Sequence, residues 1–184
     1  MVKAVFLDRD GTLIEDRGHL SHPSEVVFYP NAVECLRRLQ DAGFALFIIT
    51  NQSGVAKGEL TPQDVDRVNR YVCHYLAERG IDISAVYVCP HHRSDGCDCI
   101  KPNPHFLHRA AQEHGIDLSR TYSVGDHPCD AQLAENAGGR GVYVLSGHGE
   151  KHRSELEKDT VVVQDVAEAA EWILGQESEN VPAR

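Results

Sequence analysis

The sequence contains no uninterrupted apolar run near the ~18 residues that a membrane-spanning helix needs. Basic residues are also few, because 18 Lys and Arg stand against 28 Asp and Glu, giving a formal net charge of −10. A nucleic-acid backbone is bound largely through Lys and Arg, so this balance argues against nucleic acid as the main partner. The N-terminus shows no charged and apolar leader with a cleavage site, and we therefore expect a cytoplasmic protein that does not attach to membranes.

Long linkers, internal repeats and low-complexity segments are absent as well. A single domain over residues 1–184 is expected, since a chain of this length can bury one sizeable core. The polar tail from about Gly175 is expected to fray. A monomer is the favoured oligomeric state.

Strand and helix patterns alternate along the chain, which is typical of an α/β fold with a Rossmann-like parallel sheet and helices on both faces. Strands are expected at 4–7, 44–49, 85–88, 122–124, 141–145 and 161–163, and helices at 32–42, 61–79, 104–114, 130–137 and 165–174. Only about thirty residues separate the first two strands, and one helix uses part of them. A large cap domain does not fit there, so the site should be open and covered only by loops.

An apolar stretch that ends in two carboxylates is the most informative feature present. Residues 5–7 lead into Asp8 and Asp10, and Gly11 and Thr12 follow. Catalytic groups of open α/β sheets gather beyond the carboxyl ends of the strands. Two carboxylates that face one point hold a hard cation well, and one can act as a nucleophile while the other transfers protons. The pattern therefore indicates a catalytic pair rather than an ordinary acidic turn.

Three further segments carry polar groups at strand or loop ends. Thr50 opens a glycine-bearing turn after the second strand, where a hydroxyl and backbone N–H groups can cradle a phosphate. Lys101 precedes a helix, and Asp126 and Asp130 follow the fourth core strand. Taken singly, these segments have plainer explanations: a polar turn, a solvated lysine and a helix N-cap.

Three of the six cysteines cluster around a histidine, as Cys89, His91, Cys97 and Cys99. Clustered cysteines in a cytosolic chain indicate a metal site rather than disulfides. A Cys₃His set is a standard closed tetrahedral zinc site, so the expected zinc is structural and orders the loop before Lys101. His92 is the competing imidazole. Cys35 and Cys73 are expected in the core, while Cys129 stands alone beside an aspartate.

In this order, the four motifs resemble those of the haloacid dehalogenase-like phosphatases over roughly residues 4–145. The resemblance implies that Asp8 is the nucleophile, which becomes an aspartyl-phosphate, and that Asp10 is the general acid and base. It also implies that the Thr50 hydroxyl and Lys101 hold the transferring phosphoryl group. The expected activity is that of a phosphomonoester hydrolase.

Magnesium is the cofactor that the resemblance implies for this chemistry. Its ligands would be the carboxylates of Asp8 and Asp126 and the backbone carbonyl of Asp10. Asp130 would support the water shell of the ion. A site of a few carboxylate and carbonyl oxygens with waters and a phosphate oxygen suits Mg²⁺.

The cysteine cluster narrows the resemblance to the group of these phosphatases that act on heptose bisphosphate or histidinol phosphate, and residues 51–58 look more like the heptose enzymes. The expected partner is a small phosphorylated metabolite. D-glycero-D-manno-heptose 1,7-bisphosphate is the leading candidate, and another sugar monophosphate or histidinol phosphate is the alternative. The expected substrate-binding residues are Asp8, Arg9, Asp10, Asp16, His19, Thr50, Asn51, Gln52, Ser53, Ile100, Lys101 and His127.

Two positions depart from the pattern of the heptose enzymes. Those enzymes carry an Arg where this chain has Ile100, and commonly a basic residue where it has His127. Both changes remove positive charge where a second phosphate would need it. We therefore expect a weak preference for the bisphosphate, unless Arg17, Lys57, Arg93 or a protonated His127 compensates.

Two other classes of protein remain open at this point. A signalling receiver module also phosphorylates an aspartate in a parallel sheet with Mg²⁺, but it needs neither the paired aspartates nor the cysteine cluster. A zinc-stabilised interaction module would have no activity. Turnover of a phosphate ester would distinguish the enzyme from both.

Overall fold

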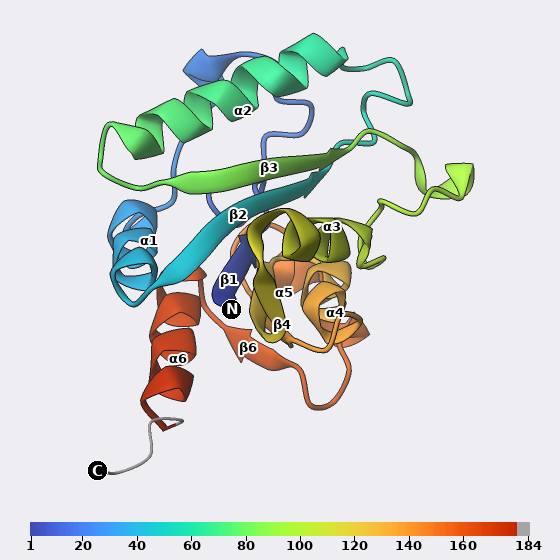
Figure 1. The fold of residues 1–184 in the computed structure, drawn as a ribbon. Coiled ribbons are helices and arrows are strands. Elements are labelled where there is room, and N and C mark those ends of the chain that lie inside the picture. The colour runs from blue at the N-terminus through green and yellow to red at the C-terminus, as the bar shows by residue number, and fades with distance from the viewer. Residues whose placement is uncertain (180–184) are drawn as a thin grey trace.

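The computed structural model describes residues 1–179, which form one six-stranded sheet with helices on both faces (Figure 1). The strand order is β3-β2-β1-β4-β5-β6, and all neighbouring strands run parallel. The strands are β1 (Val2–Leu7), β2 (Phe44–Asn51), β3 (Ile83–Cys89), β4 (Ile116–Gly125), β5 (Arg140–Val144) and β6 (Val161–Val163). This is the order of a doubly wound sheet, and the expected α/β fold is confirmed.

Helices connect the strands and cover the sheet. They are α1 (Ala32–Asp41), α2 (Pro62–Ala77), α3 (His105–His114), α4 (Pro128–Glu135), α5 (Gly149–His152) and α6 (Val166–Glu179), with 3-10 turns η1 (Pro23–Glu25), η2 (Arg93–Asp95) and η3 (Arg153–Glu155). Each helix expected from the sequence is present, and α5 is an addition. A four-residue helix has too short a pattern to be recognised in a sequence.

The two faces of the sheet carry separate hydrophobic clusters because side chains alternate along each strand. In β1, Val5 and Leu7 belong to the cluster with α1, α2 and α6. Ala4 and Phe6 belong to the opposite cluster, with α3 and α4. All four side chains are fully buried, as expected of a central parallel strand.

Helix α2 illustrates how local sequence positions an element. Thr61 caps it, since the Thr61 side chain accepts a hydrogen bond from the Asp64 backbone N–H and Asp64 bonds back to the Thr61 N–H. Pro62 occupies the first turn, where its missing N–H costs nothing. Val65, Val68, Val72 and Leu76 are buried at helical spacing.

Two boundaries differ from the expectation by more than two residues. Strand β4 begins at Ile116 rather than at 122, and its first half was missed because Asp117, Ser119 and Arg120 interrupt the apolar pattern. Helix α6 continues to Glu179 instead of ending at 174. The rest of the expected frayed tail, residues 180–184, lies outside the described residues.

The topology places the site. The chain winds from β1 outward to β3 and then returns to β4 on the other side of β1, so the order reverses between β1 and β4. Ligands of doubly wound sheets bind at such a switch point, outside the carboxyl ends of the strands. Between β1 and β2 the structure holds only η1, α1 and loops, and no cap domain lies within residues 8–43.

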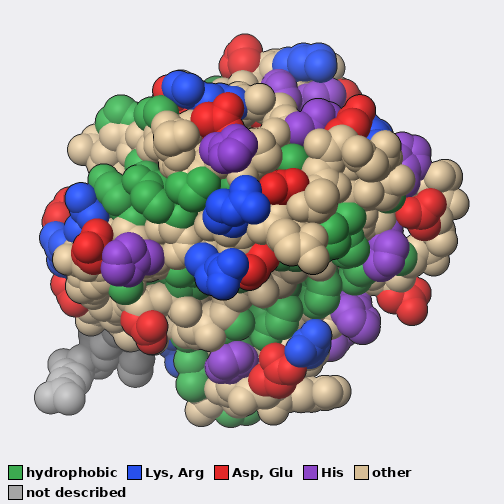
Figure 2. All heavy atoms as spheres, turned by 90° about the horizontal axis from the view of Figure 1, so that it is seen from above, with side chains coloured by type: hydrophobic (Ala, Val, Ile, Leu, Met, Phe, Trp, Pro, Cys, Tyr) green, Lys and Arg blue, Asp and Glu red, His purple; other side chains and the backbone are tan. Residues whose placement is uncertain are grey.

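The surface over α2 mixes charges of both signs. Figure 2 shows Lys and Arg side chains interspersed with Asp and Glu over the described part of this face. This distribution contrasts with the clustered basic field that binds a nucleic-acid backbone. Among the described residues, no helix is long and apolar enough to cross a lipid bilayer.

Candidate active site

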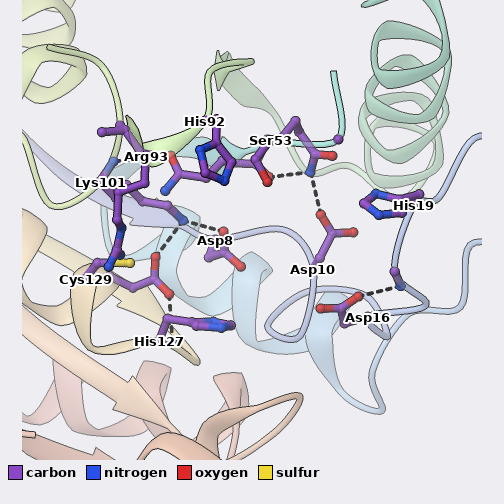
Figure 3. Close-up of a pocket in the computed structure, with 17 residues that line it drawn as sticks. Asp8, Asp10, Asp16, His19, Ser53, His92, Arg93, Lys101, His127 and Cys129 are labelled. Carbon is purple, nitrogen blue, oxygen red and sulfur yellow. Dashed lines mark hydrogen bonds and ion pairs between the residues drawn. The ribbon is translucent and has the colours of Figure 1, made fainter. Parts of the chain in front are cut away.

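A cavity of about 370 Å³ opens at the carboxyl ends of β1, β2 and β4 (Figure 3). Its size is within the usual range for small-molecule sites. Eleven of the residues expected to bind substrate line it: Asp8, Asp10, Asp16, His19, Thr50, Asn51, Gln52, Ser53, Ile100, Lys101 and His127. The walls come from segments far apart in the sequence, which the parallel sheet brings to one edge.

A buried ion cluster lies at the base of the cavity. Lys101 Nζ is 2.5 Å from Asp8 Oδ1 and 2.6 Å from Asp130 Oδ1, and it also donates to the Ile49 carbonyl. Burial lowers the pKa of Lys101, but the charges of Asp130 and Asp8 outweigh burial and hold the pKa above its ordinary value. Lys101 therefore stays protonated and supplies a fixed positive charge next to Asp8.

The electrostatic balance at Asp8 is different. Burial raises the pKa of Asp8 well above its ordinary value, Lys101 opposes the shift, and the charges of Asp130, Asp126 and Asp10 add to it. Ionised Asp8 is therefore crowded by like charges that a single lysine does not offset. A divalent cation would relieve this crowding.

The chemistry and spacing of the acidic groups fit such a cation. Carboxylate oxygens of Asp8, Asp126 and Asp130 lie within 4.8 Å of one another. Hard oxygen donors of this kind are what Mg²⁺ prefers. Asp126 Oδ2 accepts the His148 backbone N–H at 2.7 Å, and Oδ1 lies 3.0 Å from His127 Nδ1. The Asp126 carboxylate is thus held in place by two neighbours.

Asp10 is oriented by neighbours that the sequence does not indicate. The Arg9 guanidinium lies 2.8 Å from Asp10 Oδ2, and Gln52 Nε2 donates to the same oxygen at 2.8 Å. Arg9 is buried and its other end donates to Asn69 on α2 at 2.6 Å. Arg9 was expected to bind substrate, but its side chain does not line the cavity and instead holds Asp10 against α2.

The turn after β2 is tied to both sides of the site. Gln52 Nε2 also donates to the Thr50 hydroxyl at 2.8 Å, and Asn51 Oδ1 accepts the Lys101 backbone N–H at 3.2 Å. On the outer rim, Asp16 accepts the Gly18 N–H, while His19 lies 2.8 Å from Glu59. The inner residues are thus rigidly linked, and the outer ones lie on exposed loops.

The four clustered ligand residues come together beside the cavity. The Sγ atoms of Cys89, Cys97 and Cys99 are 3.2–3.7 Å apart, and His91 Nδ1 lies 3.3 Å from Cys99 Sγ and 3.8 Å from Cys89 Sγ. These separations are far longer than a disulfide bond of about 2.05 Å. They are close to the ~3.8 Å edge of a tetrahedron with Zn–S bonds of about 2.3 Å. The donor set is therefore compatible with zinc, and His92 points elsewhere, with Nδ1 bonded to Ser94.

Comparison with known proteins places the chain in a family. The HAD-hydrolase-like family model matches residues 98–169. A D-glycero-beta-D-manno-heptose-1,7-bisphosphate 7-phosphatase from Yersinia pestis is 36% identical over 180 residues, which cover 94% of this chain and 90% of that protein. The chain belongs to the HAD-like hydrolases. The corresponding enzyme of Escherichia coli K12 is 35% identical over the same length.

Solved structures agree with this HAD-like assignment. The D,D-heptose 1,7-bisphosphate phosphatase from B. bronchiseptica, crystallised with magnesium and phosphate, is similar with a TM-score of 0.86 and 32% identity. The similarity covers 95% of this chain and 99% of that one. The HAD-like chain is thus a phosphatase, an enzyme rather than a receiver or a bare interaction module.

Several cavity residues of this HAD-like phosphatase were outside the expected substrate-binding set. They are Gly18, Gly54, His92, Arg93, Cys129 and Asp130. His92 and Arg93 lie between His91 and Cys97 of the cysteine cluster, in a loop that contributes to the cavity wall. The sequence gives two indirect signals for them: this loop leads directly into Lys101, and Arg93 is one of the four cations that could compensate for Ile100.

Proposed function

We propose that this HAD-like phosphatase removes the 7-phosphate from D-glycero-D-manno-heptose 1,7-bisphosphate, with Asp8 as the nucleophile. The observation that carries the proposal is the similarity to named heptose bisphosphate phosphatases along nearly the whole of both chains. The cavity supports it, since it combines paired aspartates, a buried lysine and a hydroxyl at the carboxyl ends of the strands.

In the first step, an Asp8 carboxylate oxygen bonds to phosphorus as the bond from phosphorus to the sugar oxygen breaks. Asp10 gives a proton to the departing sugar oxygen. The contacts from Arg9 and Gln52 keep the Asp10 carboxyl fixed for this transfer. Lys101 and the Thr50 hydroxyl stabilise the oxygens of the transferring phosphoryl group, where negative charge is concentrated.

The second step hydrolyses the aspartyl-phosphate. Asp10, now ionised, takes a proton from a water molecule as that water attacks phosphorus. Orthophosphate leaves and the Asp8 carboxylate is restored. One residue serves as acid and then as base, so the two steps return the enzyme to its starting state without another proton carrier.

The three carboxylates of Asp8, Asp126 and Asp130, which lie within 4.8 Å of one another, support a magnesium site here. The carboxylates of Asp8 and Asp126, with the backbone carbonyl of Asp10, would hold the ion, and Asp130 would support its water shell. When bound, Mg²⁺ neutralises charge on the phosphoryl oxygens and on the carboxylates. The Cys89, His91, Cys97 and Cys99 quartet would hold a structural zinc, because a closed set leaves no position for substrate.

A phosphate-release assay with Mg²⁺ tests the proposal. The substrates are heptose 1,7-bisphosphate, heptose 7-phosphate and histidinol phosphate, each with the parent protein and with Asp8→Asn. The proposal predicts release from the heptose esters that depends on Asp8. Higher kcat/KM for histidinol phosphate than for either heptose ester would replace the proposed substrate with that alternative.

A further inference from the structure

A second phosphate on the substrate needs a cation in the cavity. The structure shows which candidate cations are already engaged or lie elsewhere. Arg17 is exposed and pairs with Glu15 at 2.8 Å. Lys57 is exposed and does not line the cavity. His127 lines the cavity, but its Nδ1 is engaged by Asp126. Lys101 is enclosed by Asp8 and Asp130 at the base.

Arg93 differs from all of these. It lines the cavity, and within residues 1–179 its side chain makes no ion pair or hydrogen bond. Figure 3 shows it extending past Lys101 toward Cys129. The guanidinium charge therefore reaches the cavity wall and has no partner there.

The loop around Arg93 holds it over the cavity. Arg93 begins the 3-10 turn η2, which His92 caps by accepting the Ser94 backbone N–H. Asp95 in turn accepts the His92 backbone N–H at 2.8 Å. His91 and Cys97 bound this short segment, and both belong to the quartet whose ligand atoms converge. Arg93 is thus presented from a loop that is fixed at both ends.

Other residues that line the cavity with Arg93 offer less to an anion. Ile100 lines the same cavity and has no polar group. His92 accepts through Nδ1, so a neutral ring carries its proton on Nε2 and can donate from there. A planar guanidinium binds phosphate with two parallel hydrogen bonds, which makes Arg93 the strongest candidate ligand on this wall.

We propose that Arg93 binds the second phosphate of the substrate, remote from the phosphoryl group that Asp8 receives, and so determines preference for a bisphosphate. This inference rests on the proposed function of the site. It assigns the specificity to the loop between the quartet ligands rather than to position 100, which is apolar here.

The experiment compares kcat/KM for heptose 1,7-bisphosphate and heptose 7-phosphate in the parent, Arg93→Gln and Arg17→Gln. Arg17→Gln is the matched control, since it removes an equal charge from an exposed residue outside the cavity. Arg93→Gln should lower kcat/KM for the bisphosphate by about tenfold to a hundredfold, because a hydrogen bond to a charged group is lost. The monophosphate should change by less than about twofold, and Arg17→Gln should keep the parent ratio.

Two further arms separate recognition from a general structural effect. Ile100→Arg in the Arg93→Gln background should recover part of the bisphosphate preference, because it returns a cation to the same wall. Histidinol phosphate carries an ammonium group instead of a second phosphate, so Arg93→Gln should leave its turnover unchanged or raise it. Equal losses for all three substrates would overturn the role of Arg93.

The outcomes distinguish this inference from the function on which it rests. If the parent hydrolyses both heptose esters and Arg93→Gln keeps the parent ratio, Arg93 does not read the second phosphate and only this inference fails. If the parent releases phosphate from neither ester, the proposed function fails and the inference fails with it.

Discussion

The charge state of each ionisable side chain in this site depends on its neighbours. Lys101 keeps its charge because Asp8 and Asp130 enclose it, and the carboxyl of Asp8 is crowded by Asp126, Asp130 and Asp10. Removing one partner of a buried charge pair leaves the other uncompensated, which commonly costs about 3–5 kcal/mol. These residues therefore act as a linked set, and a single substitution also changes the electrostatics of the partners that remain.

At the residue scale, Asp10→Asn tests the proton-transfer role. The amide cannot donate a proton to the leaving group or accept one from water, so turnover of a sugar phosphate should fall by about 10²–10⁴-fold. For an activated aryl phosphate the loss in the first step should be smaller, since a good leaving group needs little protonation. The measurement is pre-steady-state product release with both substrate types. An identical loss of the first-step rate for both would exclude Asp10 as the acid.

At the scale of elements, the loop after β1 depends on a glycine. Gly11 has φ +85°, and a Cβ there would lie 2.1 Å from Asp126 Oδ2, so the loops after β1 and β4 touch across the switch point. Ser146 on the loop after β5 also donates to the Gly11 carbonyl at 2.7 Å. The sequence indicates a turn at this glycine, but not that the glycine allows Asp126 to approach.

Gly11→Ala should therefore lower the stability of the fold more than a glycine substitution that adds backbone strain alone. Gly80 is the matched control, with φ +77° and nothing within 4 Å of an added Cβ. Both alanines should lower the melting temperature, and Gly11→Ala should lower it further, since overpacking adds about 1–3 kcal/mol. At this chain length that corresponds to roughly 2–4 °C for each kcal/mol. Equal melting temperatures, measured calorimetrically, would contradict the contact with Asp126.

The loop from Cys89 to Cys99 gives a second prediction at this scale. Purified protein should carry about one zinc per chain, and Cys97→Ser should lose it while Cys73→Ser keeps it. Burial raises the pKa of the Cys89 and Cys99 thiols in the metal-free protein, so zinc must displace protons from them. Zinc affinity should consequently rise with pH.

Competition with a chromophoric chelator at about pH 6 and about pH 8 measures this dependence. Retention of zinc should be stronger at the higher pH. Zinc content that is unaffected by Cys97→Ser would remove the quartet as its site.

At the scale of the whole molecule, the hydrophobic patterns were sufficient to predict the alternation of strands and helices and the absence of an inserted cap. Asp8, Thr50 and Asp126 could be predicted to meet, because parallel strands end at one edge, whereas Lys101 lies on a loop well beyond β3 and was placed with them only by the family resemblance. The contacts of Arg9 with Asp10 and Asn69 could not be predicted, since α2 contributes Asn69 from a position that local sequence does not relate to β1. Arg93 was one of four possible cations until the loop geometry separated them.

The two hydrophobic clusters make a prediction about cooperativity. They cover opposite faces of the same strands, so neither can be exposed without disrupting the other. The zinc-loaded protein should unfold in a single thermal transition whose calorimetric and van't Hoff enthalpies agree. Two resolved transitions would show that the described residues form more than one cooperative unit.

The central claim is that Asp8 carries the phosphoryl group during turnover, and Asp10→Asn offers the most direct test. With an activated aryl phosphate and Mg²⁺, this variant should still form the aspartyl-phosphate, because the leaving group needs little protonation, but should hydrolyse it slowly. Acid quenching and peptide mass spectrometry should then find one phosphoryl group on the peptide that contains Asp8, and none when Asp8→Asn is added. A phosphoryl group on another residue would contradict the account. So would release of the aryl alcohol in a first turnover without any phosphorylated protein.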